Sequence, residues 1–190
     1  MHTAGLASFA YFYFDFKDSS KRDIRGLLSS ILAQLCDQSD HSWTILSQSY
    51  ATHRDGDDQP SEVALIKCLQ DIVKGQGQLA TYIIVDAVDE CPDGSGIPSP
   101  REKVLNLVED LVNLHSNLRI CVTSRPEQDI RMALEPLASQ HISLHEESGQ
   151  KDDISDYVRF VVRSDRTMRR WRQEDKELAV DTLIERANGM

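Results

Sequence analysis

Apolar residues recur along the chain with two spacings, and these spacings predict alternating strands and helices. Apolar runs too short for a helix predict strands over residues 10–16, 82–85, 118–123 and 141–145. Apolar residues three and four positions apart predict helices over residues 22–36, 61–75 and 104–114, with weaker helical stretches over 43–50 and 126–134. The run from Tyr82 to Val85 is apolar throughout, which is typical of a parallel strand covered by helices on both faces. This order of elements predicts an α/β fold with a three-layer parallel sheet.

Turn-forming and capping residues mark the ends of these predicted elements. Ser20 and Asp23 have the spacing of a capping pair at the first helix. Ser61 is placed to cap the next strongly predicted helix, and Gly75 is placed to end it. Residues 93–100 are rich in Gly, Ser and Pro, so they are predicted to form a surface loop.

The chain changes character after Glu146, where it becomes helical, charged and poor in strand signals. We therefore expect an α/β core over residues 1–147 and the start of a small helical subdomain over residues 148–190. Six of the fourteen arginines lie between Arg159 and Arg172, so this stretch has a charge of +5 once Asp165 is subtracted. The cluster is either a site for a phosphate or an acidic partner, or a solvated helix balanced by Asp152, Asp153 and Asp156.

Composition narrows the classes of partner. The 190 residues carry a net charge of -10, and 40% of them are hydrophobic, which suits one compact domain with a small appendage. An acidic chain is a poor match for nucleic-acid backbones and anionic membranes, because both attract positive surfaces. No stretch approaches the roughly 18 apolar residues of a membrane span, and no secretory signal is recognisable. We expect a cytoplasmic protein that binds neither nucleic acid nor membranes.

The cysteines and histidines offer weaker candidates for chemistry. Four cysteines are spaced 32, 23 and 30 positions apart, which fits neither a metal knuckle nor a compact disulfide framework: Cys36, Cys68, Cys91 and Cys121. Three of them fall on apolar faces and are predicted to pack there, whereas Cys91 is predicted to be more exposed, with acidic neighbours that raise its pKa. His141 and His145 share one face of a predicted strand but lack a third ligand, which favours ordinary surface histidines.

The strongest candidate site follows the predicted strand over residues 82–85. Asp86 comes directly after this strand, and Asp89 and Glu90 follow three and four residues later. In open α/β sheets, ligands bind beyond the carboxyl ends of the strands, where Asp86 is expected to lie. Three crowded carboxylates repel one another unless a cation such as Mg²⁺ neutralises them or one is protonated. The alternative from spacing alone is a solvated acidic turn.

The run from Val85 to Glu90 resembles the Walker B segment of NACHT-type P-loop NTPases of the STAND class. In that family, hydrophobic residues precede an Asp, a small residue and further acids, and each feature is present here. The resemblance implies that Asp86 holds Mg²⁺ through its water shell and that Ala87 leaves room beside the phosphates. It also implies that Asp89 or Glu90 positions or deprotonates the attacking water.

A second segment, residues 118–126, resembles the sensor 1 strand of the same superfamily. It ends in Thr123-Ser-Arg-Pro126, and the resemblance implies that Arg125, with Ser124, reads the terminal phosphate of a bound nucleotide. An arginine is suited to this task because its guanidinium forms bidentate, charge-assisted bonds to phosphate. The alternative is a salt bridge from Arg125 to Asp86 or Glu90.

Two further segments extend the resemblance over nearly the whole chain. Residues 10–18, with the helix that follows, resemble the second strand and helix of the fungal nephrocystin 3-like N-terminal domains, and residues 182–190 resemble a helix of their lid. No Walker A loop with its Gly-rich turn and Lys-Ser/Thr pair occurs, since residues 75–77 lack that pair. We therefore expect an incomplete P-loop NTPase-like core, truncated before Walker A, followed by part of a lid.

These features lead to competing functional expectations. The first is a NACHT-like regulatory module that binds Mg²⁺ with ATP or GTP and acts through protein partners or a homo-oligomer, as the resemblance implies. Although the family hydrolyses nucleotide, loss of the phosphate-cradling loop predicts no appreciable ATPase activity from this chain alone. The second is a non-catalytic interaction scaffold that no longer binds nucleotide. The third, a Mg²⁺-dependent nuclease built on the three acids, is disfavoured by the net charge.

Overall fold

The computed structural model describes residues 7–51, 59–75, 79–94, 96–143 and 148–186. The chain divides into two compact units, residues 1–138 and residues 139–190. The sequence placed this division between residues 147 and 148. His145, residues 76–77 of the segment compared with a Walker A loop, and residues 187–190 of the segment that resembles a lid helix lie outside the described residues.

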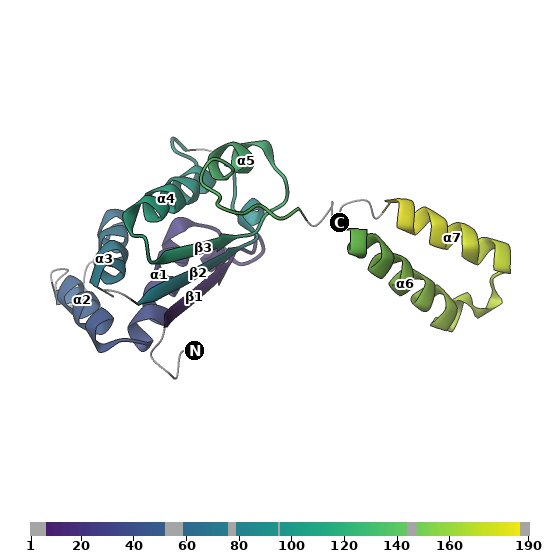
Figure 1. Ribbon diagram of the computed structural model, residues 1–190, viewed down its shortest axis with the longest axis horizontal. Coiled ribbons are helices and arrows are strands. Elements are labelled where there is room, and N and C mark those ends of the chain that lie inside the picture. The colour runs from purple at the N-terminus through teal and green to yellow at the C-terminus, as the bar shows by residue number, and fades with distance from the viewer. Residues whose placement is uncertain (1–6, 52–58, 76–78, 95, 144–147, 187–190) are drawn as a thin grey trace. The chain divides into compact units, whose positions relative to one another are not determined.

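Unit 1 is an α/β domain whose described strands form one parallel sheet in the order β1-β2-β3. Its elements, in chain order, are β1 (Ala7–Tyr13), η2 (Ser19–Lys21), α1 (Ile24–Asp37), α2 (Asp40–Ala51), α3 (Glu62–Gly75), β2 (Ala80–Asp86), η4 (Val88–Glu90), α4 (Pro100–Leu114), β3 (Leu118–Val122) and α5 (Gln128–Leu134). This order and the parallel pairing confirm the predicted α/β class with a parallel sheet (Figure 1). The strand predicted over residues 141–145 is wrong for residues 141–143, which form no strand.

The described sheet is covered by helices on one face. In register, Ala10 pairs with Ile83 and Phe12 with Val85, and these four side chains are buried under the helices. The intervening residues of β1 and β2 point to the other face, where Phe9 and its neighbour Tyr82 are exposed. The prediction that helices cover both faces of β2 is therefore wrong for the described residues. We call the uncovered side the bare face.

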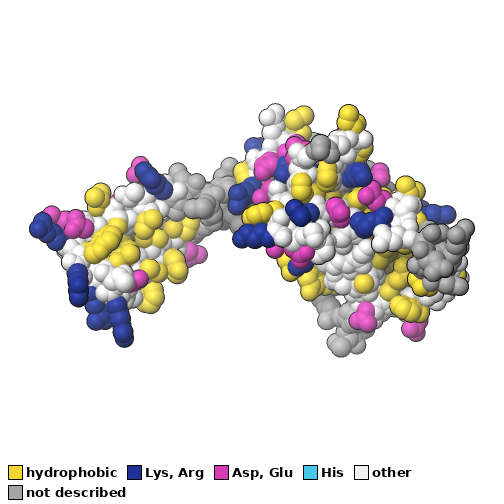
Figure 2. All heavy atoms as spheres, turned by 180° about the vertical axis from the view of Figure 1, so that it is seen from behind, with side chains coloured by type: hydrophobic (Ala, Val, Ile, Leu, Met, Phe, Trp, Pro, Cys, Tyr) yellow, Lys and Arg dark blue, Asp and Glu magenta, His cyan; other side chains and the backbone are white. Residues whose placement is uncertain are grey.

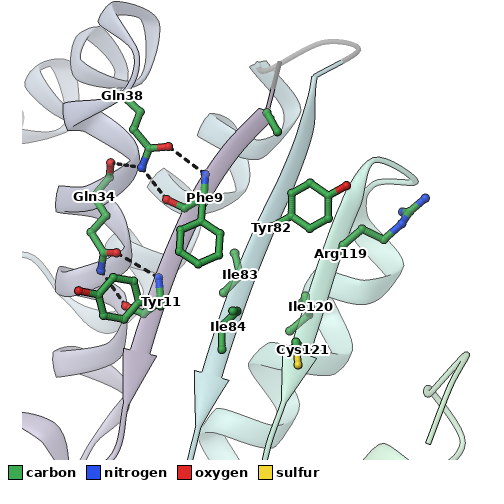
Figure 3. A pocket seen from close by; sticks show the side chains of 11 residues that line it. Phe9, Tyr11, Gln34, Gln38, Tyr82, Ile83, Ile84, Arg119, Ile120 and Cys121 are labelled. Atoms are coloured by element: carbon green, nitrogen blue, oxygen red, sulfur yellow. Dashed lines mark hydrogen bonds between the residues drawn. The ribbon is translucent and has the colours of Figure 1, made fainter. Parts of the chain in front are cut away.

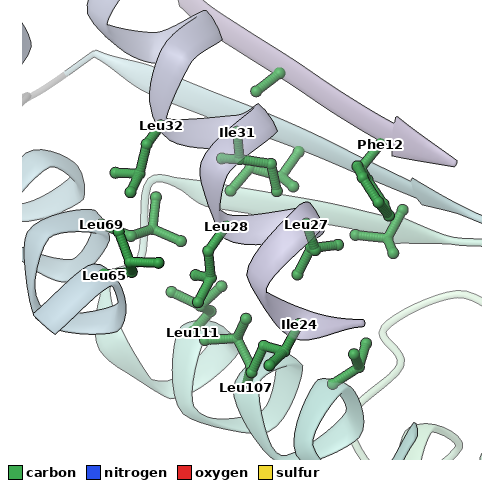
Figure 4. Close-up of a cluster of buried hydrophobic side chains, with 14 of the residues drawn as sticks. Phe12, Ile24, Leu27, Leu28, Ile31, Leu32, Leu65, Leu69, Leu107 and Leu111 are labelled. Atoms are coloured by element: carbon green, nitrogen blue, oxygen red, sulfur yellow. The ribbon is translucent and has the colours of Figure 1, made fainter. Parts of the chain in front are cut away.

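The core lies between the sheet and the helices α1, α3 and α4 (Figure 4). Helix α1 places leucines and isoleucines three and four residues apart, so one side of the helix meets the sheet and the neighbouring helices. The side chains that fill this space include Phe12, Ile24, Leu27, Leu28, Ile31, Leu32, Leu65, Leu69, Leu107 and Leu111. Burial of these side chains supplies most of the free energy that holds unit 1 folded.

Polar caps fix where the helices begin. The Asp23 carboxylate accepts a hydrogen bond from the Gly26 amide at 2.9 Å and caps α1. The predicted pairing of Ser20 with Asp23 is wrong, because Ser20 lies in η2 and its amide and hydroxyl bind Asp18 instead. Ser61 caps α3 as predicted, since its Oγ accepts from the Ala64 amide at 3.2 Å.

Unit 2 is a helical hairpin of α6 (Ser148–Ser164), η5 (Thr167–Arg170) and α7 (Gln173–Arg186). Among its described side chains, the buried ones are Val162 and Val180, whereas Tyr157, Phe160 and Trp171 are exposed. Figure 2 shows apolar side chains gathered over this hairpin and basic side chains projecting from one end of it. In the described part of the hairpin, no ion pair joins the arginines of residues 159–172 to an acidic side chain.

No helix within the described ranges combines the length and the apolar character that crossing a bilayer requires.

Candidate functional site

The carboxyl ends of the three parallel strands are tied to one another by backbone hydrogen bonds. We call residues 86–90 the acidic turn and residues 123–127 the β3 exit. The Phe14 amide donates to the Asp86 carbonyl at 3.0 Å, and the Val88 amide donates to the Thr123 carbonyl at 3.1 Å. The acidic turn therefore lies between the ends of β1 and β3, at the edge of the sheet where α/β proteins bind ligands.

Asp86 is held by a residue that sequence reasoning did not assign to the site, Thr123. The Thr123 hydroxyl donates to the Asp86 carboxylate, and the same oxygen accepts from the Ala87 amide at 3.0 Å. Thr123 thus fixes both the backbone and the carboxylate at the start of the acidic turn. One feature of the sequence could have identified Thr123: it is the first polar residue after the apolar run of β3, just as Asp86 is the first polar residue after the apolar run of β2.

Ala87 adopts a left-handed backbone conformation, with φ 56° and ψ 48°. This conformation costs an L-residue with a Cβ roughly 1–2 kcal/mol, and a small side chain tolerates it better than a branched one. The reversal of direction at Ala87 sends the chain from β2 directly into η4, which carries Asp89 and Glu90. The left-handed conformation of Ala87 thus lies at the point where β2 ends and the turn that carries the three acids begins.

Asp89 pairs with Arg125 across the end of the sheet. The Asp89 carboxylate accepts from the Arg125 amide at 3.0 Å and lies 3.5 Å from the Arg125 Nε. The Asp89 side chain is 10% exposed, whereas that of Arg125 is 82% exposed, so the guanidinium is open to solvent. The salt bridge expected from Arg125 to Asp86 or Glu90 is thus made with Asp89 instead.

The three carboxylates of the acidic turn have three different partners. Asp86 binds Thr123, Asp89 binds Arg125, and Glu90 accepts from the Phe16 amide at 3.2 Å. Hydrogen bonds and one salt bridge therefore relieve the repulsion that the sequence placed among these acids. Ser124, the remaining predicted phosphate contact, is exposed at the β3 exit beside Arg125.

The donor set at this site suits a cation that keeps much of its water. Within the described ranges, no group of three His, Cys, Asp or Glu side chains is arranged to hold a metal ion. Mg²⁺ commonly uses one or two carboxylates, with waters and ligand phosphates completing its octahedron. The exposed Asp86 carboxylate, with the Thr123 hydroxyl beside it, matches that mode of binding.

A buried arginine under the acidic turn, Arg101, was also missed by sequence reasoning. It is 6% exposed, its Nε donates to the Cys91 carbonyl at 2.9 Å, and its Nη2 donates to the Asp89 carbonyl at 2.7 Å. Its Nη1 binds the Glu127 and Asp129 carboxylates, the latter at 3.2 Å. Burial by itself lowers the pKa of this guanidinium, but the bonds from the two carboxylates outweigh burial, so the net shift is upward.

Two of the four cysteines differ from prediction in their exposure to solvent. Cys91 is fully buried, not exposed, and its thiol donates to the Arg22 carbonyl at 3.4 Å. Burial raises its pKa to about 12, so the predicted direction is right but acidic neighbours are not the main cause. Cys121, predicted to pack on an apolar face, is exposed on the bare face, whereas Cys36 and Cys68 are buried as predicted.

The bare face forms a second notable surface, a shallow apolar hollow of about 610 Å³ across the middle of the sheet. Figure 3 shows aromatic side chains from β1 and β2 lining it, with Gln34 and Gln38 of α1 along its border. Each glutamine amide both accepts from and donates to one residue of β1, Gln38 binding the backbone of Phe9 and Gln34 that of Tyr11, at 2.5–3.1 Å. These side chains take the place of a neighbouring strand along the edge of β1.

Comparison with known proteins gives one family and no individual relative. The family model described as nephrocystin 3, N-terminal matches residues 2–125, which include β1, β2, β3, the acidic turn and most of the helical layer. Neither the curated proteins nor the solved structures contain a match to the chain. Since the matched region covers most of its length, the chain belongs to the nephrocystin 3 N-terminal family.

Proposed function

We propose that this chain is a nucleotide-responsive regulatory module of the NACHT type, and that the acidic turn and the β3 exit bind the phosphates of a Mg²⁺–nucleotide. The observation that carries this proposal is the pairing of Asp89 with the largely exposed Arg125, beside the Asp86–Thr123 pair, at the carboxyl ends of adjacent parallel strands. An acid that follows a buried strand and an arginine at the end of the next strand form a pair of groups that a Mg²⁺–phosphate ligand can bridge.

Each residue has a distinct part in this proposal. Asp86 holds Mg²⁺ through its water shell, and the ion, when bound, neutralises the charge of the phosphates. Arg125 exchanges its carboxylate partner Asp89 for a terminal phosphate oxygen, and Ser124 adds a hydroxyl beside it. The exchange frees the Asp89 carboxylate, so Asp89 or Glu90 is then available to orient water. Nucleotide state would thereby alter contacts between the acidic turn and the β3 exit.

Binding without rapid hydrolysis is the expected behaviour of the 190-residue chain. Positioning and charge neutralisation make up most of what a protein contributes to phosphoryl transfer, and a Walker A loop supplies much of both. The printed sequence contains no such loop. We therefore expect millimolar affinity for Mg²⁺-ATP or Mg²⁺-GTP and no appreciable turnover by the chain alone, with regulation acting through protein partners or a second copy in the cytoplasm.

Thermal unfolding in the presence of nucleotide tests this proposal. At ten times the dissociation constant, a ligand specific for the folded state stabilises it by about 1.4 kcal/mol, which raises Tm by roughly 3–6 °C for a chain of this size. The rise should require Mg²⁺ and nucleotide together and should disappear in Asp86→Asn and Arg125→Gln.

Matched controls separate a site from a general charge effect. Asp110→Asn and Arg119→Gln change an exposed acid on α4 and an exposed arginine on the bare face, away from the acidic turn. Both should keep the rise in Tm. Absence of any shift at millimolar Mg²⁺-ATP and Mg²⁺-GTP, or an equal shift in Asp86→Asn, would contradict the proposal.

A second candidate function is a non-catalytic interaction scaffold. The observations that favour it are the bare face of the sheet and the exposed aromatic side chains of α6. Large exposed apolar patches commonly mark protein–protein contact sites. A chain that shows no nucleotide response, yet loses binding to a captured protein partner on Tyr11→Ser or Phe160→Ser, would favour the scaffold over the nucleotide module.

A further inference from the structure

We infer that Arg101 is the positioning residue of the candidate site, holding the acidic turn in fixed register with the β3 exit and α5. The role of the site rests on the proposed function, whereas the positioning itself rests on contacts within unit 1. Arg101 is a member of neither motif that the sequence brought to notice. It lies on α4, and its partners are 10 to 28 residues away along the chain.

The position of Arg101 is unfavourable in free energy, so we infer that its contacts offset this cost. It occupies the first turn of α4, after Pro100, where the helix dipole disfavours a positive charge. Its side chain is 8% exposed, and a buried charge is unfavourable unless it is paired and hydrogen-bonded. All three of its guanidinium nitrogens are hydrogen-bonded.

The contacts of Arg101 divide into two sets that face different segments. One set binds the carbonyls of Asp89 and Cys91, which lie on either side of Glu90 in the chain. The other set binds Glu127 and Asp129, at the start of α5. Glu127 occupies the N-cap position of α5 but makes no capping bond there, and its carboxylate binds Arg101. A single planar group thus joins the acidic turn to α5.

Arg101 works beside the Asp89–Arg125 pair. The Asp89 carboxylate binds the β3 exit at Arg125, and Arg101 binds it two residues later, at Glu127. The Glu127 amide also donates to the Arg125 carbonyl at 2.8 Å. If a phosphate takes Arg125 away from Asp89, the contact through Arg101 remains. The acidic turn and the β3 exit therefore keep their spacing while the Arg125 side chain changes partner.

The geometry requires arginine in preference to lysine. Five donors in a rigid planar fork reach two carbonyls on one side and two carboxylates on the other, whereas a lysine ammonium is a single point with three donors. Because the side chain is buried beneath the turn, it touches no bound nucleotide. Its effect on the site passes through the backbone of Asp89 and Cys91.

Arg101→Lys, followed by residue-resolved amide hydrogen exchange, tests this inference. The reporters are the Cys91 amide, which donates to Val88 within the acidic turn, and the Arg131 amide, which donates to Glu127 in α5. We expect both to exchange at least about tenfold faster, the effect of losing one charged hydrogen bond. Amides of Leu28 and Ile83 in the core should keep their rates. Unchanged exchange at Cys91 and Arg131, or equal acceleration at Leu28 and Ile83, would overturn the inference.

Two further variants keep the test decisive. Lys103→Met removes the half-exposed ion pair between α4 and Glu62 and should leave both reporters unchanged. Glu127→Gln combined with Asp129→Asn changes two carboxylates that are each 42% exposed and keeps their side-chain oxygens as acceptors, so it tests the same contacts without altering the buried side chain. It should accelerate exchange at Arg131 but not at Cys91. Unchanged exchange at Arg131 in this variant would contradict the role of Arg101.

A nucleotide measurement distinguishes failure of the inference from failure of the proposed function. In folded Arg101→Lys, the rise in Tm with Mg²⁺-ATP should be lost, as it is in Asp86→Asn. Full retention of the rise would show that Arg101 does not position the site. If the unmodified chain itself shows no rise, the proposed function fails, and the exchange rates alone decide whether Arg101 holds the turn.

Discussion

The two faces of the three-stranded sheet both carry apolar side chains, but helices cover one face and the described residues leave the other bare. On the covered face, Ile83 and Val85 are no more than 2% exposed. On the bare face, Phe9, Tyr11 and Tyr82 are 42–53% exposed. The same strands therefore contribute to the core through every second residue and present an aromatic surface through the others.

The two edges of the sheet differ in a similar way. Along β1, Gln34 and Gln38 bind the backbone groups that an added strand would need. Along β3, parallel geometry turns the backbone of Ile120 and Val122 away from β2, and no described residue binds those groups. Unit 1 thus draws its stability from one face and closes one edge, while the bare face and the β3 edge contribute little to its fold. Substitutions on the two sides should consequently differ in cost.

Truncation of a core leucine on the covered side should have the largest effect. Leu28 of α1 is 0% exposed and packs among the side chains shown in Figure 4, so Leu28→Ala should lower the free energy of unfolding by about 2–5 kcal/mol. Tyr82→Ser on the bare face should cost well under 1 kcal/mol. Urea titration followed by circular dichroism measures both. Similar costs for the two variants would mean that the bare face is covered in solution.

Alkaline pH should weaken the covered side through its buried thiols. Burial raises the pKa of Cys68 to about 11 and that of Cys91 to about 12, so the folded chain keeps protons that an unfolded thiol releases near pH 9. Their contribution to stability is complete below pH 9 and falls as pH rises, by about 1.4 kcal/mol per thiol per pH unit. Urea titrations from pH 8.5 to 10.5 should show a shallower decline in Cys91→Ala than in the unmodified chain. Equal slopes would contradict this assignment.

Thiol labelling at pH 8 sharpens the same comparison without unfolding the protein. Of the four cysteines, Cys121 on the bare face is exposed, and the other three are buried. A disulfide reagent should therefore modify one thiol quickly, and Cys121→Ser should remove that fast phase. Slow modification of Cys121 would indicate that a further segment or partner covers the bare face.

Loss of the glutamine pair should have a modest effect on the free energy of unfolding but a visible effect on association. Gln34→Ala combined with Gln38→Ala removes the side-chain bonds to Phe9 and Tyr11, at a cost of about 1–2 kcal/mol. It also frees the edge of β1 for pairing with another chain. Light scattering should detect concentration-dependent association in this variant and none in Asn106→Ala, which alters an exposed residue of α4. If the double glutamine variant stays monomeric, the two glutamines do not prevent pairing along the edge of β1.

Much of the fold was readable in the sequence because its signals are local. Spaced leucines predicted α1, and short apolar runs predicted β2 and β3, with ends correct to within a few residues. Burial of alternate faces was harder, because β1 reads Phe9-Ala-Tyr-Phe-Tyr13 and offers apolar side chains to both sides. The burial of Phe12 and the exposure of Tyr11 depend on which face of the sheet α1 covers, and this is set by tertiary packing.

The residues of the candidate site also differ in whether the sequence alone reveals them. Asp86, Asp89, Glu90 and Arg125 were found because each follows a strand, and parallel strands bring their carboxyl ends together. Arg101 was not found, because its partners come from two segments far from it along the chain, residues 89–91 and 127–129, and no spacing in the sequence brings them together. Cys91 was placed outside on account of its polar neighbours, whereas packing under the acidic turn buries it.

Paramagnetic broadening by Mn²⁺-ATP tests the central proposal, a phosphate site at the carboxyl ends of β2 and β3, most directly. Mn²⁺ replaces Mg²⁺ with the same preference for oxygen ligands and broadens the resonances of nearby amides. We predict that broadening is strongest at Ala87, Val88 and Ser124 and clearly weaker at Phe9, which lies four residues before the end of β1. Loss of this broadening in Asp86→Asn, but not in Asp110→Asn, would complete the expected result. Uniform broadening, broadening centred elsewhere, or no change at millimolar Mn²⁺-ATP would contradict the account.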